Sequence, residues 1–336
     1  MKLVSKLLPI IAAAGVTLGV STSSPAETNE LRVAKQYGLG YLQMMVMEEQ
    51  KLVEKHAKAA GLGDLKLTWA TFRSSDVMND ALLSGNLDFA CLGIPGLATI
   101  WARTRGTPSE VRGASGFNVL ALTLITRSPN IKSLKDYTDK DKIALPAVKV
   151  AMQAILLQMA AAKLFGEQNY TKLDSLTVSM AHPDSMAALL SGAGEIGSHF
   201  ASPPFIQKEL ERPGMHKVID SVDILGGPIS FNIVSAPAKF RDANPKTYAA
   251  FLSALQEATD FINKDKRSAA ELYIKVTRDK SPVEDILKII NDPNNEYTLL
   301  PKNVMQIVAF MYKTGSIKTQ PGSWKDLFFA NVQSGS

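Results

Sequence analysis

The chain has 336 residues, a formal charge of +5 and a single cysteine, and 46% of its residues are hydrophobic. The length is sufficient for two lobes with apolar cores, and one cysteine excludes an intramolecular disulfide. Basic residues are scattered and are not interleaved with aromatic ones, which argues against nucleic-acid binding, while the mild positive charge suits a small anionic ligand.

Residues 1–26 have the pattern of a secretory signal. Lys2 and Lys6 form a positive start, residues 7–20 are almost entirely apolar, and Ser24-Pro25-Ala26 fits a cleavage site. The apolar run is short for a membrane span, although an uncleaved N-terminal anchor is the alternative. No cysteine follows the signal, as a lipoprotein would need. We therefore expect cleavage after Ala26 and a soluble periplasmic protein.

Apolar strands then alternate with helices, the pattern of an α/β fold with a mostly parallel sheet. The helix expected at 42–60 is closed by Gly61, and proline stands near the start of the helix expected at 95–103. The other expected helix covers 77–84, and the expected strands cover 31–36, 65–72, 87–92 and 111–114.

The same scheme returns after residue 126 and predicts a second lobe. Two long apolar segments, 118–126 and 228–236, are expected to carry the chain between the lobes, an arrangement that permits hinge closure around a ligand. The second lobe is expected to contain strands at 142–145, 176–181, 196–199 and 216–220, and helices at 150–164, 185–190 and 204–211.

The chain beyond Pro237 is expected to be helical, with helices at 245–263, 266–277, 282–291 and 301–313. The resulting division is a signal at 1–26, the first part of lobe 1 at 27–117 and lobe 2 at 118–227. The return strand and the completion of lobe 1 follow at 228–336.

A short sequence motif occurs twice, once in each expected lobe, and supports this duplication. Ala81-Leu82-Leu83-Ser84-Gly85 is echoed by Ala188-Leu189-Leu190-Ser191-Gly192. Each copy predicts a helix stopped by glycine, and each is followed by an acidic residue, a short strand and a proline turn. Two similar α/β lobes imply a cleft between them, although a chance match of a common helix ending is the alternative.

Candidate ligand contacts in the first lobe follow the ends of its strands, where open α/β sheets place ligands. Serine hydroxyls and amide groups at helix starts bind anions well, but they equally serve as ordinary helix caps. Arg73 has an alternative role as a surface or inter-lobe contact, and the residues near 117 as hinge packing. The candidates are Tyr37, Leu39, Tyr41, Arg73, Ser74, Ser75, Asp76, Ile94, Phe117 and Asn118.

The second lobe supplies a matching set after its own strands. Lys149 is either an anion donor or a solvated lysine at a helix start, and His182 either reaches the cleft or caps a helix next to Asp184. The strand before His199 runs toward the cleft. The candidates are Pro146, Lys149, Met152, His182, His199 and Phe200.

Nothing in the sequence indicates catalysis, a metal or a cofactor. The four histidines are not at metal-ligand spacing to one another or to the cysteine. The serine-nucleophile elbow and the phosphate-binding loop are also absent. We therefore expect a binding protein without a cofactor.

With two lobes, two crossings and a signal, the chain resembles the periplasmic substrate-binding proteins of ABC importers, within them the nitrate/sulfonate/taurine-type family. The resemblance rests on residues 31–38, 69–76, 81–95 and 133–146. It implies a type II periplasmic binding protein fold, two α/β lobes joined by two crossing strands with the ligand cleft between them. It also implies an ABC permease in the inner membrane as partner, and we expect a monomer.

Two departures from the family pattern bear on the ligand. Family members often have a small Gly-Ser helix start where this chain has residues 147–152, and a tryptophan where it has His199-Phe200. Both changes favour a larger organic anion, such as a sulfonate or an aromatic carboxylate, over nitrate. Two other classes stay open: a same-fold enzyme of thiamine-pyrimidine or menaquinone biosynthesis, which the export signal disfavours, and a periplasmic sensor ligand module.

Overall fold

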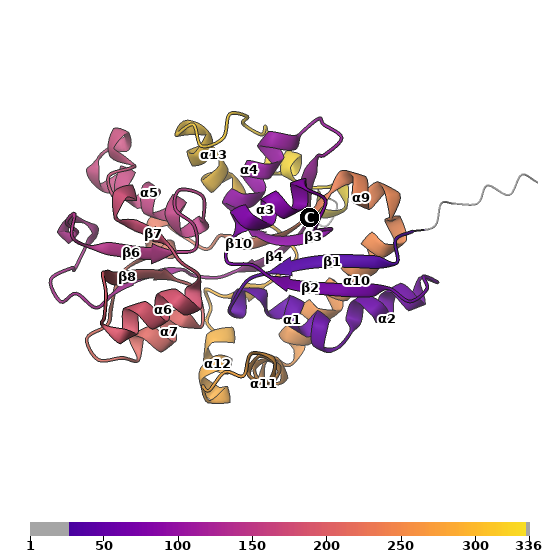
Figure 1. Cartoon of the computed structure of the whole chain (residues 1–336), viewed down its shortest axis with the longest axis horizontal. Helices are drawn as coiled ribbons and strands as arrows, with labels where there is room; N and C mark the ends of the chain where they lie inside the picture. Colours follow the sequence, from indigo (N-terminus) through magenta and orange to yellow (C-terminus); the bar gives the residue numbers. More distant parts are fainter. Residues whose placement is uncertain (1–26, 334–336) are drawn as a thin grey trace, which may run out of the picture.

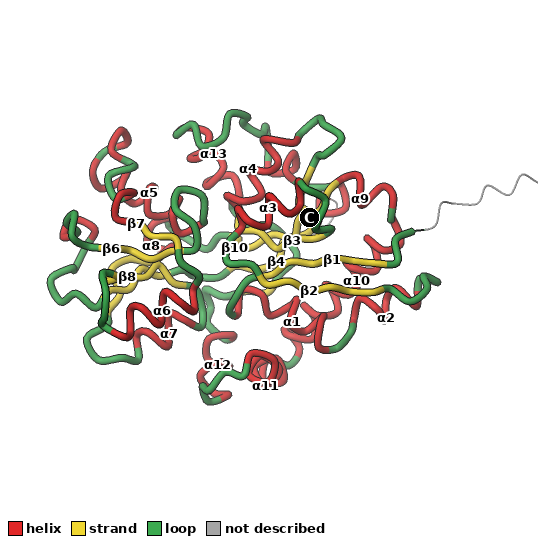
Figure 2. Tube along the Cα trace, in the orientation of Figure 1, coloured by secondary structure: helices red, strands yellow, loops and turns green. Residues whose placement is uncertain are grey.

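The computed structural model describes residues 27–333, so the segment expected as a signal lies outside the described residues. Two β-sheets lie side by side along the long axis of the molecule, and helices cover both faces of each sheet (Figures 1 and 2). This confirms the α/β class and the two lobes expected from the alternation of strands and helices.

The first sheet has the strand order β11-β4-β10-β3-β1-β2. β1 pairs in parallel with β2 and β3, whereas β10 is antiparallel to both β3 and β4. Its strands are β1 (Glu30–Lys35), β2 (Lys66–Thr71), β3 (Phe89–Gly93), β4 (Val111–Val119), β10 (Ser230–Pro237) and β11 (Glu296–Tyr297).

The second sheet has the order β7-β6-β8-β5-β9 and repeats this plan. β6 is parallel to β7 and β8, and β5 is antiparallel to β8 and β9. β1, β2, β3, β10 and β4 therefore correspond to β6, β7, β8, β5 and β9. The strands are β5 (Thr123–Thr126), β6 (Lys142–Leu145), β7 (Thr177–Ser179), β8 (Ile196–Ala201) and β9 (His216–Asp220).

The repeated sequence motif occupies equivalent positions in the two lobes. One copy ends α3 (Ser75–Leu83) before β3, and the other ends α6 (His182–Ser191) before β8. Gly85 and Gly192 have φ of 72° and 69°, the left-handed region that glycine adopts at helix ends. The duplication predicted from these residues is confirmed.

The remaining helices of the two lobes flank the sheets. In the first lobe they are η1 (Leu39–Tyr41), α1 (Leu42–Glu49), α2 (Leu52–Ala59) and α4 (Ile94–Thr104), and in the second α5 (Met152–Phe165), α7 (Phe205–Leu210) and α8 (Ser221–Leu225). The single helix expected at 42–60 is wrong, because Lys51 adopts φ of 52° and separates α1 from α2.

The first segment expected to connect the two lobes is also interrupted. The segment 118–126, expected as one strand, is the end of β4, a break at 120–122 and then β5. Asn118 and Val119 still pair with β10 and β11 of the first sheet, whereas Thr123 pairs with β8 and β9 of the second. The return strand β10 lies wholly in the first sheet.

The C-terminal helices complete the packing. α10 lies against α1, α2 and α11, while α13 contacts α4 of the first lobe and α5 of the second. They are α9 (Ala238–Ala243), α10 (Pro245–Lys264), α11 (Lys266–Thr277), α12 (Val283–Ile290), α13 (Val304–Lys313), η5 (Trp324–Leu327) and α14 (Ala330–Gln333). None of the helices within residues 27–333 has the length and apolar character needed to cross a membrane.

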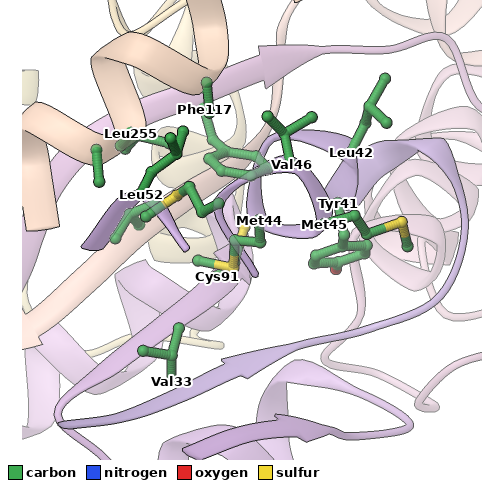
Figure 3. Close-up of a cluster of buried hydrophobic side chains, with 14 of the residues drawn as sticks. Val33, Tyr41, Leu42, Met44, Met45, Val46, Leu52, Cys91, Phe117 and Leu255 are labelled. Atoms are coloured by element: carbon green, nitrogen blue, oxygen red, sulfur yellow. The ribbon is translucent and has the colours of Figure 1, made fainter. Parts of the chain in front are cut away.

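A large apolar cluster joins the first sheet to α1 and α10 (Figure 3). Figure 3 shows Cys91 inside it beside Met44, and burial raises the pKa of the Cys91 thiol well above its usual range. This thiol is packed and inert, as expected from its place in an apolar strand. Deeper in the cluster, the rings of Phe89 and Phe251 stack with centroids 3.8 Å apart.

We predict that Phe251→Ala lowers the free energy of unfolding by about 3–5 kcal/mol, because a fully buried ring leaves a cavity that its neighbours only partly fill. Urea denaturation followed by circular dichroism measures the change. Phe261→Ala, at a half-buried position of the same helix, is the control and should cost clearly less. Equal losses for the two variants would contradict the packing described here.

Candidate functional site

A narrow, partly enclosed cavity lies between the lobes, where strands of both sheets end. Its volume is about 20 Å³, room for little more than one ordered water molecule. The first lobe contributes Gln36 after β1, parts of β3 and β10, and its helix starts. The second lobe contributes the loops after β6 and β8 and the starts of α5 and α6. Its lining residues are Gln36, Tyr41, Ser75, Gly93, Pro146, Ala151, Met152, Gln153, His182, Ser202, Phe231 and Asn232.

Ser75 organises the first-lobe wall. Its Oγ accepts hydrogen bonds from the Gly93 amide at 3.2 Å and from Gln36 Nε2 at 3.4 Å. Gln36 directly follows β1, Ser75 opens α3 and Gly93 ends β3, so one hydroxyl ties together three adjacent segments of the first lobe.

Two buried asparagines fix the neighbouring loop. Asn118 Nδ2 and Asn232 Nδ2 donate to the Gly40 carbonyl at 2.8 and 2.9 Å, and the Tyr41 hydroxyl donates to Asn232 Oδ1 at 3.4 Å. These bonds tie the Gly40 carbonyl and the Tyr41 hydroxyl to β4 and β10, so the Tyr41 ring is held at the cavity wall.

Four helices begin at the cavity. Ser75 is at the start of α3, Gly93 precedes α4, Gln153 is in the first turn of α5 and His182 opens α6. None of these four helices has a side-chain cap on its first turn. Uncapped helix starts offer amide groups and the positive ends of helix dipoles to the cavity, and no Arg or Lys side chain of the described residues lines it. Pro95 and Pro183 remove one amide each from α4 and α6, and Asp76 and Asp184, in the first turns of α3 and α6, lie outside the lining.

A chain of buried titratable groups leads from the cavity into the second lobe. His182 Nδ1 lies 2.8 Å from His199 Nε2, and His199 Nδ1 lies 2.5 Å from Glu209 Oε1. Burial raises the pKa of Glu209 to about 9 and lowers that of His199 to about 3. Burial and the adjacent His199 lower the pKa of His182 well below its usual range. All three groups are therefore favoured in their neutral forms.

The lobes meet at the edge of the cavity. The Leu39 amide donates to the Pro203 carbonyl at 3.0 Å, and Lys208 of α7 pairs with Asp279 at 2.6 Å. A second, wider cavity of about 480 Å³ adjoins this edge and shares Gln36 with the enclosed one. It is lined from both lobes, among others by Tyr37 and Phe205.

The sequence model of the NMT1-like family matches residues 24–276. The chain belongs to the NMT1-like family. None of the curated proteins matches it.

Solved structures show which fold this NMT1-like chain has. The periplasmic aliphatic sulphonate binding protein SsuA from Escherichia coli aligns with a TM-score of 0.63 at 18% identity, covering 90% of this chain and 98% of that one. The periplasmic nitrate-binding protein NrtA from Synechocystis PCC 6803 aligns at 0.67 and 17% identity, covering 92% and 86%. A ligand-binding component of an ABC-type import system from Staphylococcus aureus aligns at 0.63 and 13% identity, covering 91% and 98%.

These likenesses confirm the periplasmic binding protein fold and the family-level resemblance drawn from the sequence. All three neighbours are binding proteins. Within the described residues of the NMT1-like chain, no group of three or more His, Cys, Asp or Glu side chains is arranged to hold a metal ion.

Of the sixteen candidate residues, the structure brings five to the enclosed cavity. Tyr37, 37% exposed, lines the wider cavity instead, and the Leu39 amide makes the contact between the lobes. The five that line the enclosed cavity are Tyr41, Ser75, Pro146, Met152 and His182.

Five other candidates lie inside the protein and outside the lining. Ile94 and Phe200 pack in one apolar cluster, and Phe117 in another. Asn118 positions the Gly40 loop, as the hinge alternative anticipated, and His199 is shielded from the cavity by His182. None of these five side chains lines the cavity, because each is directed into packing or into a hydrogen bond, and their contact with a ligand stays a prediction.

The remaining candidates do not line the cavity either. Arg73 lies outside the lining, and the Ser74 hydroxyl donates to Asp76 beside the start of α3. Lys149 is exposed with φ of 65° and acts electrostatically on Asp174. This exposed position agrees with the alternative interpretation, a solvated lysine before a helix.

Seven lining residues were absent from the candidates. Gln36 and Ser202 are each the first residue beyond a strand, Gln36 next to the candidate Tyr37 and Ser202 two residues after the candidate Phe200. Phe231 and Asn232 come from the return strand, which was interpreted only as a hinge. The seven are Gln36, Gly93, Ala151, Gln153, Ser202, Phe231 and Asn232.

Proposed function

We propose that this protein is the periplasmic solute-binding component of an ABC importer, which captures a small organic anion between its lobes and delivers it to an inner-membrane permease. The protein then acts as a monomer without catalysis, after removal of residues 1–26. Its family and its fold, shared with binding proteins of import systems, support this role.

The observation that carries the anionic ligand is the meeting of four uncapped helix starts at one enclosed cavity. Each uncapped start contributes the positive end of a helix dipole and first-turn amide groups, one fewer in α4 and α6 because Pro95 and Pro183 have no N–H. The side-chain amides of Gln36 and Gln153 add neutral donors, and no acidic side chain lines the cavity within residues 27–333.

The apolar part of the wall favours an organic solute over a bare oxyanion. Met152, Phe231 and Pro146 line the same cavity as the polar groups, so a carbon-bearing end of the ligand has contacts of its own. A sulfonate or carboxylate with its organic group exceeds about 20 Å³. Binding therefore requires the lobes to part and close again around the solute, with room toward the wider cavity at Gln36.

Titration calorimetry with methanesulfonate, taurine, benzoate and nitrate tests this function. We expect an organic anion to bind and to raise the melting temperature, because a ligand that binds only the folded protein stabilises it. A response to nitrate alone would contradict an organic ligand, and no response to any anion would contradict the anionic class.

We further predict that Ser75→Asp weakens binding of the anion about 100-fold or more, because a carboxylate within the cavity repels the ligand and occupies the α3 amides. Calorimetry on the best ligand of the panel measures this loss. Ser84→Asp places the same charge at the exposed far end of the same helix and should bind as the wild type does. Equal affinity for the two variants would exclude Ser75 from the site.

A further inference from the structure

The chain Glu209–His199–His182 is buried along its whole length. His199 and Glu209 are 0% exposed and His182 is 5% exposed, and only His182 reaches the cavity. Glu209 Oε2 is buried without a hydrogen-bond partner among the described residues. A carboxylate with one bare oxygen is costly to bury, so the structure favours a proton on Glu209 in the unliganded protein.

A protonated Glu209 fixes the direction of every hydrogen bond in the chain. Its O–H donates to His199 Nδ1, and His199 Nε2–H donates to His182 Nδ1. His182 then carries its own proton on Nε2, the nitrogen 3.2 Å from the Gln153 amide. The amide presents its oxygen to that proton by rotating half a turn, which leaves its shape unchanged.

We propose that an anion entering the cavity draws two protons along this chain, which turns His182 into an imidazolium and Glu209 into a carboxylate. This rests on the proposed function, and it identifies His182 as the group that supplies a full positive charge to the ligand.

The transfer is balanced within the chain. The Glu209 O–H bond breaks as an N–H bond forms at His199 Nδ1, and the His199 Nε2–H bond breaks as an N–H bond forms at His182 Nδ1. His182 keeps its Nε2–H, which is directed at the Gln153 amide in the cavity wall, and no proton enters from solvent. Both hydrogen bonds persist with their directions reversed, so no heavy atom has to leave its place.

An anion is needed because the separated charges are otherwise uncompensated. Asp184 of α6 and Glu211 beyond α7 lie outside the chain, and Lys208 of α7 is paired with Asp279. Without a ligand charge beside His182, burial opposes ionisation of all three groups. The chain therefore favours an anionic solute over a neutral one of the same shape, which makes it a specificity device.

Nitrogen-15 NMR of the histidine-labelled full chain at pH 7 tests this directly. Without an anion, both His182 and His199 should carry a single proton, on Nε2. When the tightest-binding anion of the panel is added to saturation, His182 should become protonated on both nitrogens and His199 should change to the Nδ1–H tautomer. A merely structural role for the chain would not invert the His199 tautomer.

The matched variants are Glu209→Gln and Glu211→Gln. In Glu209→Gln the new side-chain amide can still donate to His199 but has no proton to give up. His199 should therefore stay in the Nε2–H form, and anion affinity should fall roughly 10- to 100-fold. Glu211→Gln, at an exposed position, should behave as the wild type does. Calorimetry in two buffers of different ionisation heat should show no net proton uptake by the wild type.

The outcomes separate this proposal from the proposed function. If an anion binds while His182 stays neutral and Glu209→Gln retains its affinity, the proton transfer is overturned and the binding function stands. If no anion of the panel binds, both are overturned. The wild-type spectra decide the matter even if Glu209→Gln fails to fold.

Discussion

Gly38→Val is expected to weaken solute binding about 10- to 100-fold while leaving the fold intact. Gly38 has φ of 90° and ψ of −177°, and a Cβ placed there would lie 2.7 Å from the Pro203 carbonyl oxygen of the opposite lobe. The strained φ affects the protein whether open or closed, but the collision affects only the closed arrangement. Overpacking costs about 1–3 kcal/mol, and each 1.4 kcal/mol changes the dissociation constant about tenfold.

Titration calorimetry on the best-binding anion measures the change. Gly63→Val is the control, because nothing lies within 4 Å of a Cβ at that position and its φ is not in the left-handed region. Unchanged affinity in Gly38→Val would mean that the Leu39–Pro203 contact between the lobes does not form when the solute is bound.

The second large effect concerns pH. The pKa of Glu209 is raised in the folded protein to about 9, against about 4.5 for an unperturbed carboxyl. Because the folded state holds this proton more tightly than the unfolded state, its contribution to stability is complete below about pH 4.5 and is lost as the pH rises toward 9. The slope is at most about 1.4 kcal/mol per pH unit.

Glu209→Gln removes this titration. We expect the wild type to lose about 2 kcal/mol more stability than Glu209→Gln between about pH 6.5 and 8.5. Urea denaturation at a series of pH values measures the difference, and Glu211→Gln serves as the exposed control. Parallel stability curves for wild type and Glu209→Gln would show that Glu209 is already ionised in the folded protein.

His182 and His199 affect the stability of the folded protein at acidic pH. Their pKa values are lowered in the folded protein, so their contribution is complete above about pH 6.5 and is lost as the pH falls toward the folded-state values. Acidification through this range therefore removes the stability that the two neutral histidines contribute, whereas alkalinisation removes the contribution of Glu209.

The fold was predictable because its signals are local and are repeated. Both lobes contain alternating apolar segments, helices that end at glycine and helices that begin with proline. All of these patterns predict the same architecture. The break between α1 and α2 was not predictable. It depends on a left-handed backbone conformation at Lys51, and glycine or asparagine, the residues that usually adopt this conformation, does not stand there.

The site was only partly predictable, for a reason of strand geometry. Successive side chains of a strand point to opposite faces of the sheet. The direction of a strand toward the cavity therefore does not tell which of its side chains lines the cavity. His199 and Phe200 lie on β8 inside the protein, while Ser202, just past its end, lines the cavity. Gln36 and Ser202 are the first residues beyond β1 and β8 as the structure bounds these strands, whereas the strands expected from the sequence end at Gln36 and His199.

Lys149 illustrates the second reason. In the sequence this lysine stands next to the start of an expected helix, and helix starts are frequent anion-binding sites. Lys149 adopts a left-handed conformation with its side chain outside the cavity lining, and the influence of its charge falls on Asp174. A cavity with neutral lining groups and a hidden Glu209 could be found only from the folded chain.

The most direct test is a crystal structure of the protein with an organic sulfonate or carboxylate bound. We predict that the acidic group of the solute lies between Ser75, Gln153 and His182, at the first turns of α3, α5 and α6. A solute bound instead in the surface groove lined by Lys163, Tyr170 and Phe310, with the enclosed cavity unchanged, would contradict this account.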